Sequence, residues 1–310
     1  MNCYVDIEFA DGVTWIARIR LDDPLLPPPA IQARIFLSEV ATLEFLARMR
    51  VPAPRVYGYE LEAPGNPVGT SYVLMEKLAG QPLDWNSASA EERARVMEQL
   101  ADVYLELERH PIPQTGSASP LSGGAEPGRV QIGVFAQTPC FETAERGLGP
   151  LPVDNYLGFL WRLQALPELV AGSASHAGPG YNITGIIDWE FASAEAKELA
   201  FSSPCMMWPV GKFYDGDNVL AEDEERFADI FERRGRGDLA EMVRGGRRWQ
   251  RYLFFLGGGI PGDMAELEPL FQGLRRGFMA LSKFQRRELV PKGGGKQRKY
   301  NGKGEWSMEF

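Results

Sequence analysis

Cysteine and histidine are scarce in this sequence. Its 310 residues include three cysteines, Cys3, Cys140 and Cys205, and two histidines, His110 and His176. An odd number of widely separated cysteines does not form a disulfide framework and indicates a reducing compartment, so we expect a cytoplasmic protein. So few thiol and imidazole groups also argue against a Cys/His zinc site.

Long apolar runs and an excess of basic residues are missing too. No stretch reaches the roughly 18 apolar residues of a membrane span, and the first residues do not resemble a signal peptide. Lys and Arg number 33 against 42 Asp and Glu, a net charge of −9, whereas dedicated nucleic-acid binders are usually basic. We therefore expect neither a membrane nor a nucleic acid as partner, and the oligomeric state stays open. Apolar residues make up 44% of the chain, enough for a sizeable core in about two domains.

The chain opens with the pattern of a β-hairpin followed by a helix. Apolar and polar residues alternate over 3–9 and again over 13–20, and Asp11 with Gly12 between the two runs is typical of a hairpin turn. After three prolines at 27–29, apolar residues at spacings of three and four predict a helix over 33–49.

The remainder is mainly helical. A short apolar strand is predicted at 72–75, and a capping box formed by Ser89 and Glu92 opens the next helix. Further helices are predicted at 221–234, 238–256 and 264–284, whereas the Gly- and Lys-rich tail 291–310 is expected to be disordered. A β-rich beginning and a helical remainder predict an α+β fold.

The first candidate for chemistry is Asp188, which directly follows the apolar strand 183–187. A carboxylate held rigidly at the end of a buried strand suits a hard cation such as magnesium, which prefers oxygen ligands. Alternatively, an aspartate at a strand end caps the turn that follows. The residues alone leave both roles open.

The second candidate is a strand cation with a helix carboxylate. Arg18 and Arg20 share one face of the predicted strand because side chains repeat every two residues, and Glu39 lies in the predicted helix. Such a pair can hold the oxygens of a polyphosphate. Because Arg and Glu are usually solvated surface residues, that alternative also stays open.

The third candidate is the segment 75–80, in which a strand runs into a short crossover. Backbone groups near Met75, Glu76 and Leu78 suit the edge of an adenine ring, although any interdomain linker has a similar pattern. A fourth segment, 205–209, combines with nearby aromatic residues to predict either an apolar substrate pocket or plain core.

Taken in order, these pieces resemble the aminoglycoside phosphotransferase and choline-kinase-like family, particularly its fungal members. The most specific pieces are WIAR at 15–18, SEVATL at 38–43, YVLME at 72–76 and NITGIIDWE at 182–190. The resemblance covers most of residues 1–285. It implies a two-lobed protein-kinase-like fold, with a small β-rich N-lobe over 1–78 and a larger, mostly helical C-lobe over 79–290.

The resemblance also implies roles for the candidate residues. Arg18, paired with Glu39, is expected to contact the phosphates of ATP, with Arg20 as the alternative. The adenine would bind at 75–78, and Asp188 would bind magnesium. The implied activity is ATP-dependent phosphoryl transfer to a hydroxyl group of a small-molecule substrate.

The chain departs from the family pattern in its catalytic loop. Family members carry His-x-Asp-x-x-x-x-Asn roughly 15 to 20 residues before the metal-binding Asp, but the window 168–181 contains no Asp. Gly178 stands where the Asp is expected after His176, Asn182 falls one position short of the Asn, and Glu168 lies at the far edge. The catalytic residue is therefore unknown, and impaired activity or a catalytically dead pseudokinase that binds a nucleotide or a partner is expected.

Two further segments differ from the family pattern. The strand and the Gly- or Ser-rich turn that cover the phosphates would precede Met1, and the stretch 148–152 lacks the usual extra helical sequence. We therefore expect a truncated version of the fold. Mis-splicing of a kinase-like gene is one hypothesis for it, and sequencing of the transcript tests that hypothesis.

Overall fold

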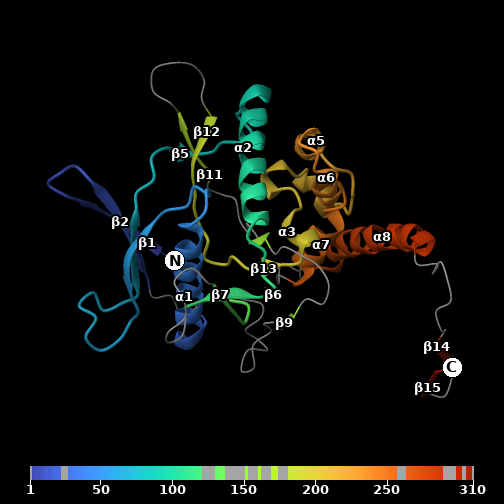
Figure 1. The fold of residues 1–310 in the computed structure, drawn as a ribbon, viewed down its shortest axis with the longest axis horizontal. Helices are drawn as coiled ribbons and strands as arrows, with labels where there is room; N and C mark the ends of the chain where they lie inside the picture. The colour runs from blue at the N-terminus through green and yellow to red at the C-terminus, as the bar shows by residue number, and fades with distance from the viewer. Residues whose placement is uncertain are drawn as a thin grey trace.

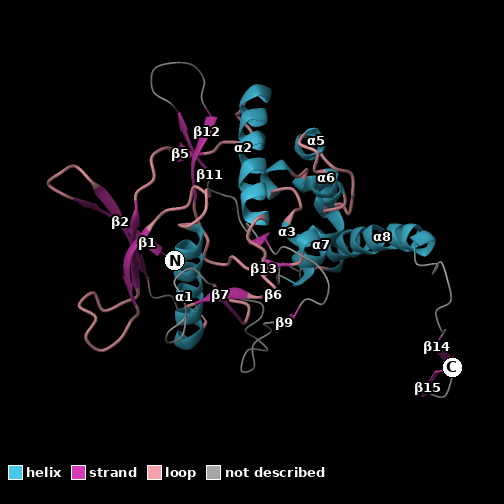
Figure 2. Cartoon of the chain, viewed as in Figure 1, coloured by secondary structure: helices cyan, strands magenta, loops and turns pink. Residues whose placement is uncertain are grey.

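The computed structural model describes residues 2–21, 27–120, 130–136, 151–152, 160–161, 169–173, 181–256, 263–288, 298–301 and 305–308. An antiparallel sheet lies at one end of the molecule and a group of helices at the other, with helix α2 (Ala90–Glu108) between them (Figure 1). The colouring by secondary structure shows the same division into a part rich in strands and a helical part (Figure 2). The predicted α+β fold is confirmed.

The N-terminal sheet has the strand order β1-β2-β4-β3, with every neighbouring pair antiparallel. Its strands are β1 (Asn2–Glu8), β2 (Thr14–Arg20), β3 (Val56–Glu60) and β4 (Tyr72–Glu76). The predicted hairpin turn is confirmed, because Gly12 has a φ of 84° and the Val13 N–H donates to Asp11 Oδ1 at 3.0 Å. Strand β3 was not predicted from the sequence, since it is short and its register shifts beside Gly58.

Helix α1 (Pro29–Leu46) covers one face of this sheet. It begins four residues before the predicted position 33, because a proline is tolerated in the first helical turn, where its missing N–H has no intrahelical acceptor. Phe36 and Val40 of α1 are buried against Val73 and Met75 of β4. This contact sets the distance between the helix and strand β2, which lies beside β4.

A second, smaller sheet follows the first. Its order is β12-β11-β5, formed by β12 (Tyr181–Ile186), β11 (Leu169–Ser173) and β5 (Gln81–Pro82). Strand β5 comes soon after β4, so the segment between them runs from one sheet to the other. The end of β12 therefore lies close to that segment.

Helix α2 begins at the predicted capping box. The Ser89 N–H donates to Glu92 Oε2 at 2.7 Å, and the Glu92 N–H donates to Ser89 Oγ at 3.2 Å. The buried face of α2 presents Tyr104, whose ring meets Phe201 and Phe227 edge-on. The largest hydrophobic core cluster forms around this contact.

The remaining helices pack beyond α2. They are α3 (Lys197–Ala200), α4 (Val210–Tyr214), α5 (Glu222–Arg233), α6 (Gly237–Arg244), α7 (Arg247–Leu256) and α8 (Met264–Glu288). The single helix predicted over 238–256 is wrong in one respect: it is divided into α6 and α7 at Gly245 and Gly246. A Cβ atom on Gly246 would lie 2.8 Å from Ser202 Cβ, so this turn requires glycine for close packing.

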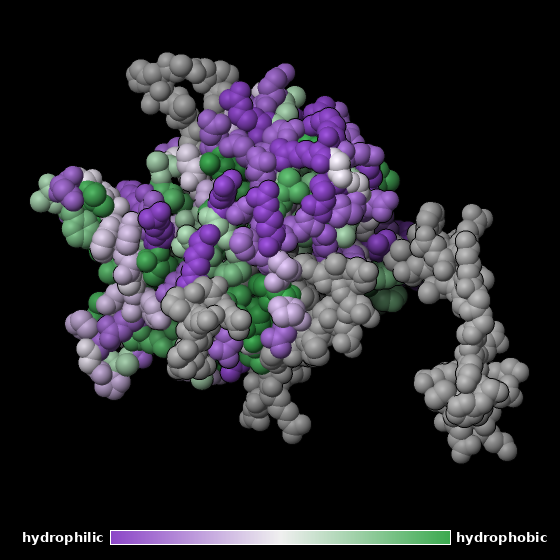
Figure 3. All heavy atoms as spheres, in the orientation of Figure 1, coloured by the Kyte–Doolittle hydropathy of each residue, from purple (hydrophilic) through white to green (hydrophobic). Residues whose placement is uncertain are grey.

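The surface of the helical part is strongly hydrophilic (Figure 3). Ion pairs tie its helices together: Arg234, at the end of α5, contacts Glu98 and Asp102 of α2 at 2.6 and 2.7 Å. Within the described residues, no helix combines the length and the apolar character that a bilayer span requires.

Short strands complete the described chain. They pair as β6 (Gln114–Thr115) with β9 (Leu151–Pro152), β7 (Ser117–Ser119) with β8 (Gln131–Gly133), and β10 (Leu160–Trp161) with β13 (Ala194–Glu195). Within the tail 291–310, for which the sequence predicts disorder, β14 (Arg298–Asn301) pairs with β15 (Glu305–Met308).

Candidate functional site

A pocket of about 380 Å³ lies where the N-terminal sheet, α1, the segment after β4 and the residues after β12 meet. Its walls include every residue that the sequence predicted for a nucleotide and metal site. These are Arg18, Glu39, Met75, Glu76, Leu78 and Asp188. The fold thus brings together side chains that are up to 170 positions apart in the chain.

Arg18 and Glu39 form a buried ion pair at the back of this pocket. Arg18 comes from β2 and Glu39 from the facing side of α1, and an Nη2 hydrogen of Arg18 is donated to Glu39 Oε2. The residues are 7% and 3% exposed. Burial raises the pKa of Glu39 to about 6, although Arg18 opposes this shift. Burial alone would lower the pKa of Arg18, but the Glu39 and Glu190 carboxylates outweigh it and raise that pKa.

A second ion pair lies beside the pocket and was not predicted. Arg20, at the end of β2, donates from Nη2 to Glu190 Oε1, and Glu190 also lines the pocket. The sequence analysis gave Arg20 only as an alternative to Arg18 and gave Glu190 no role. The available signal was that Arg20 shares a strand face with Arg18 and that Glu190 lies two residues after Asp188.

Asp188 has an unusual backbone conformation. It is exposed, lines the pocket, and has a φ of 65°, in the left-handed region. Its neighbours are fixed: the Ile186 N–H donates to Pro52 O at 2.7 Å, and Trp189 is 2% exposed with its Nε1 donating to Ile186 O at 2.8 Å. Non-glycine residues persist at such φ values only where the surrounding structure imposes them, most often at functional sites.

The end of β4 and the segment that follows it form another wall. Met75 is buried and pairs with Ile16 of β2 and Val56 of β3, which places it inside the sheet next to the pocket. The Glu76 N–H donates to Arg55 O at 2.8 Å, which holds the start of the segment. At its far end Thr184 of β12 donates its hydroxyl hydrogen to Ala79 O.

Leu78 fits closely against strand β12. A Cβ atom on Gly185 would lie 2.2 Å from Leu78 Cδ1, so the leucine side chain occupies the space that any larger residue at 185 would need. Among the described residues, no hydrogen bond to the backbone of Leu78 is found.

The charges around the pocket are suited to a divalent cation. Four carboxylates line the pocket, Glu39, Glu76, Asp188 and Glu190. They exceed by two the positive charges of Arg18 and of Arg20, which is paired with Glu190. Among the described residues no group of three acidic, Cys or His side chains is arranged as a complete metal site. A magnesium ion in proteins often takes one or two carboxylates and completes its shell with phosphate oxygens and water, so Asp188 fits such an ion only together with a phosphorylated ligand.

The residues near the missing catalytic loop are mostly outside the described part of the chain. Glu168, His176 and Gly178 lie outside the described residues. Asn182 is exposed on β12, and its Cα is paired with Gly172 of β11.

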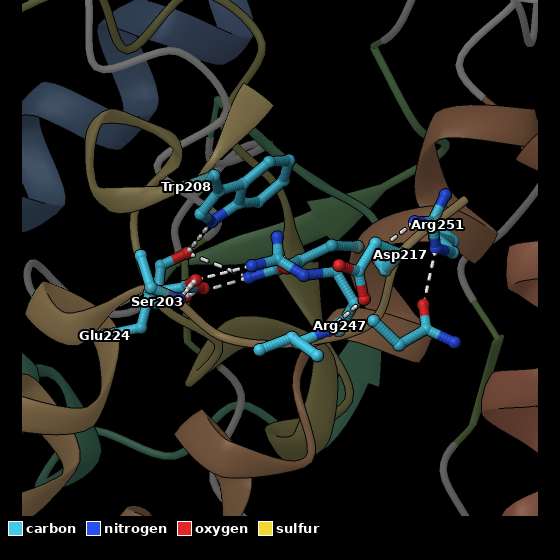
Figure 4. A network of polar contacts seen from close by, with 10 residues as sticks. Ser203, Trp208, Asp217, Glu224, Arg247 and Arg251 are labelled. Carbon is cyan, nitrogen blue, oxygen red and sulfur yellow. Dashed lines mark hydrogen bonds and ion pairs between the residues drawn. The ribbon is translucent and has the colours of Figure 1, made fainter. Parts of the chain in front are cut away.

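The aromatic segment 205–209 belongs to a buried polar network rather than to a large pocket (Figure 4). Trp208 Nε1 donates to Ser203 O at 2.9 Å, and the Arg247 guanidinium lies 5.3 Å from the centre of the Trp208 ring. Arg247 in turn contacts Glu224 at 2.5 Å. The adjoining cavity has a volume of about 50 Å³, far below the 300–1,000 Å³ of typical small-molecule sites.

Comparison with known proteins points to phosphotransferases. Residues 7–137 match the model of the phosphotransferase enzyme family. Residues of this chain are 37% identical over 83 positions to a subtelomeric hrmA-associated cluster protein in each of two Aspergillus fumigatus strains. That match covers 26% of this chain and 16% of each relative, so the chain aligns with about one sixth of their length.

Solved structures with a similar course of the chain have low sequence identity to it. The GDP complex of aminoglycoside 2'-phosphotransferase-IIIa is 16% identical with a TM-score of 0.48, and each chain is covered to 90%. The Plasmodium vivax ethanolamine kinase is 10% identical with a TM-score of 0.45, covering 92% of this chain and 81% of the kinase.

The family match spans the segments that supply Arg18, Glu39 and the 75–78 wall of the pocket, and it ends before Asp188. Residues 7–137, less than half of the chain, are thus similar to the phosphotransferase enzyme family.

Proposed function

We propose that this protein binds a magnesium–ATP complex in the pocket and transfers the terminal phosphoryl group, with impaired efficiency, to a hydroxyl group of a small molecule. The observation that carries this proposal is the convergence of Arg18, Glu39 and Asp188 on one pocket whose other wall is the segment 75–78. In phosphoryl transfer the protein contributes mainly positioning and charge neutralisation, which is what these side chains offer.

Different residues of the pocket are suited to different parts of the nucleotide. Ile16, Met75 and Leu78 give the pocket apolar surfaces suited to a planar base, and the Leu78 backbone offers a donor and an acceptor to its edge. Arg18 presents a guanidinium to phosphate oxygens, and Glu39 keeps that group in one orientation. An arginine in this role differs from a lysine because it binds as a planar fork.

Asp188 would hold the metal. When bound, magnesium neutralises charge on the phosphate oxygens and orients them. Because the carboxylates that line the pocket outnumber Arg18 and Arg20 by two, a polyanionic nucleotide without a metal ion meets net repulsion. We therefore expect nucleotide binding to depend strongly on magnesium.

A second candidate function is a pseudokinase that binds the nucleotide, or a partner, without transferring phosphate. The observation that favours it is the absence of any Asp in the window 168–181. A general base contributes roughly 10² to 10⁴ in rate, so its loss alone predicts a very slow enzyme.

Turnover with a panel of small-molecule hydroxyl acceptors tests the proposal. We expect slow, magnesium-dependent ATP consumption that disappears in Asp188→Asn and persists in Asp215→Asn, a matched control in which the exposed carboxylate lies outside the pocket. ATP binding without turnover would favour the pseudokinase. If neither binding nor turnover depends on Asp188, both functions are rejected.

A further inference from the structure

The Arg20–Glu190 ion pair joins the N-terminal sheet to the segment that carries Asp188. We propose that this pair is an interlobe tether that positions Asp188 for the metal ion of a bound nucleotide. The inference rests on the proposed nucleotide site and adds two positioning residues to it.

The Arg20 end of the tether is fixed by the backbone around it. Arg20 is the last residue of β2, and its N–H donates to Ser71 O at 3.0 Å. Its carbonyl oxygen accepts a hydrogen bond from the Thr70 hydroxyl at 2.8 Å. The guanidinium therefore projects from a rigid strand end rather than from a free loop.

The Glu190 end is fixed as well, and Asp188 lies between two attachments. On one side, the Ile186 N–H is bonded to Pro52 O in the connection between α1 and β3. On the other side, Glu190 is bonded to Arg20 of β2. The five residues 186–190 are thus held at both ends by the N-terminal lobe, with the left-handed Asp188 in the middle.

Because the pair is largely buried, loss of either partner is costly. The Arg20 and Glu190 side chains are 13% and 9% exposed, so removing either charge leaves the other with little access to water. Residues that orient a metal ligand without touching the metal usually matter 10- to 100-fold for metal affinity. We expect the same of this pair.

An alternative role for Arg20 makes the opposite prediction. Its Nε is buried and has no hydrogen-bond partner among the described residues. The alternative role is that of a second phosphate ligand, which Glu190 keeps away from the nucleotide. In that case Glu190→Gln would release Arg20 and tighten nucleotide binding. If the pair is a tether, replacing either partner weakens the positioning of Asp188 and so weakens magnesium-dependent nucleotide binding.

The test measures ATP affinity by titration calorimetry, once with magnesium and once with EDTA. The metal dependence is the dissociation constant of ATP in EDTA divided by that in magnesium. We expect Arg20→Gln and Glu190→Gln each to lower this ratio about tenfold. The double variant should be no worse than either single one, and the charge exchange R20E/E190R should restore most of the ratio. Urea denaturation of each variant shows whether it is folded.

The matched control is Asp6→Asn, which breaks the exposed pair between Asp6 and Lys77 at 2.5 Å. It should leave the ratio unchanged. A wild-type ratio that persists in folded Arg20→Gln and Glu190→Gln, or tighter binding by Glu190→Gln, overturns the tether alone. A wild-type ratio of one overturns the proposed nucleotide site and the tether with it.

Discussion

At the scale of single residues, Arg18 and Glu39 are two charged side chains that are buried from solvent. Transferring a charged group out of water costs several kcal/mol. The attraction between the two charges offsets this desolvation cost only when the geometry of the pair is good. The raised pKa of Glu39 agrees, because it shows that the buried carboxylate resists ionisation even beside an arginine. The pair is therefore a poor source of stability, and its position in the pocket points to a binding role.

Replacing this pair should separate stability from binding. Arg18→Met leaves the Glu39 carboxylate buried without its cation and should lower the free energy of unfolding at pH 7 by about 3 kcal/mol. Adding Glu39→Leu should recover most of that loss, whereas ATP affinity should stay lost. Urea denaturation and calorimetric titration measure the two quantities. A double variant that binds ATP like the wild type would show that Arg18 does not contact the phosphates.

The ionisation of Glu39 predicts a dependence of stability on pH. Its pKa is raised to about 6 in the folded protein from an ordinary value of 4.5, so the folded state holds the proton more tightly. This stabilisation is fully present below pH 4.5 and is lost as the pH rises through 6, a loss of about 2 kcal/mol. Urea denaturation from pH 4 to 7 should show this decline relative to Glu39→Gln. Parallel curves for the two proteins would contradict it.

The sequence indicated some of the pocket residues and not others for a physical reason. Arg18 lies in a regular alternation, Glu39 in a periodic helix and Asp188 at a strand end, so each has a local signal. The contact between Arg20 and Glu190 joins residues 170 positions apart. No local pattern predicts such a contact, which depends on how the sheet and β12 come together.

At the scale of elements, strand β12 decides the shape of the pocket through its contact with the segment after β4. Gly185 lets Leu78 lie directly on the strand, and Leu78 also lines the pocket. A larger residue at 185 must displace the leucine side chain. The element boundaries that the sequence missed have similar causes, since β3 has a register shift beside Gly58 and the turn between α6 and α7 depends on the close packing of Gly246.

Gly185→Ala should therefore impair binding more than folding. The added methyl group pushes Leu78 toward the pocket, and we expect ATP affinity to fall about tenfold, or 1.4 kcal/mol. Overpacking of this kind costs about 1–3 kcal/mol of stability. The variant G185A/L78A removes the clash and should recover part of the affinity. Titration of both variants measures the effect, and equal affinity in wild type and Gly185→Ala would contradict the assigned position of the ligand.

At the scale of the whole molecule, the order of elements in the sequence predicted the division into a β-rich part and a helical part, and the structure has that division. What the sequence did not contain was the way the two parts meet. The pocket takes its walls from β1, β2, α1, the segment after β4 and the residues after β12. The central claim is that this junction binds a nucleotide together with magnesium, with Asp188 as the metal ligand.

Thermal unfolding with ATP and magnesium tests this claim most directly. A ligand at 100 times its dissociation constant stabilises the folded state by about 2.7 kcal/mol, which corresponds to a rise of roughly 4 °C in Tm for a protein of this size. We predict that rise for the wild type and for Asp215→Asn only when ATP and magnesium are both present, and almost none for Asp188→Asn. An unchanged Tm for the wild type, or an equal rise in Asp188→Asn, would contradict the account.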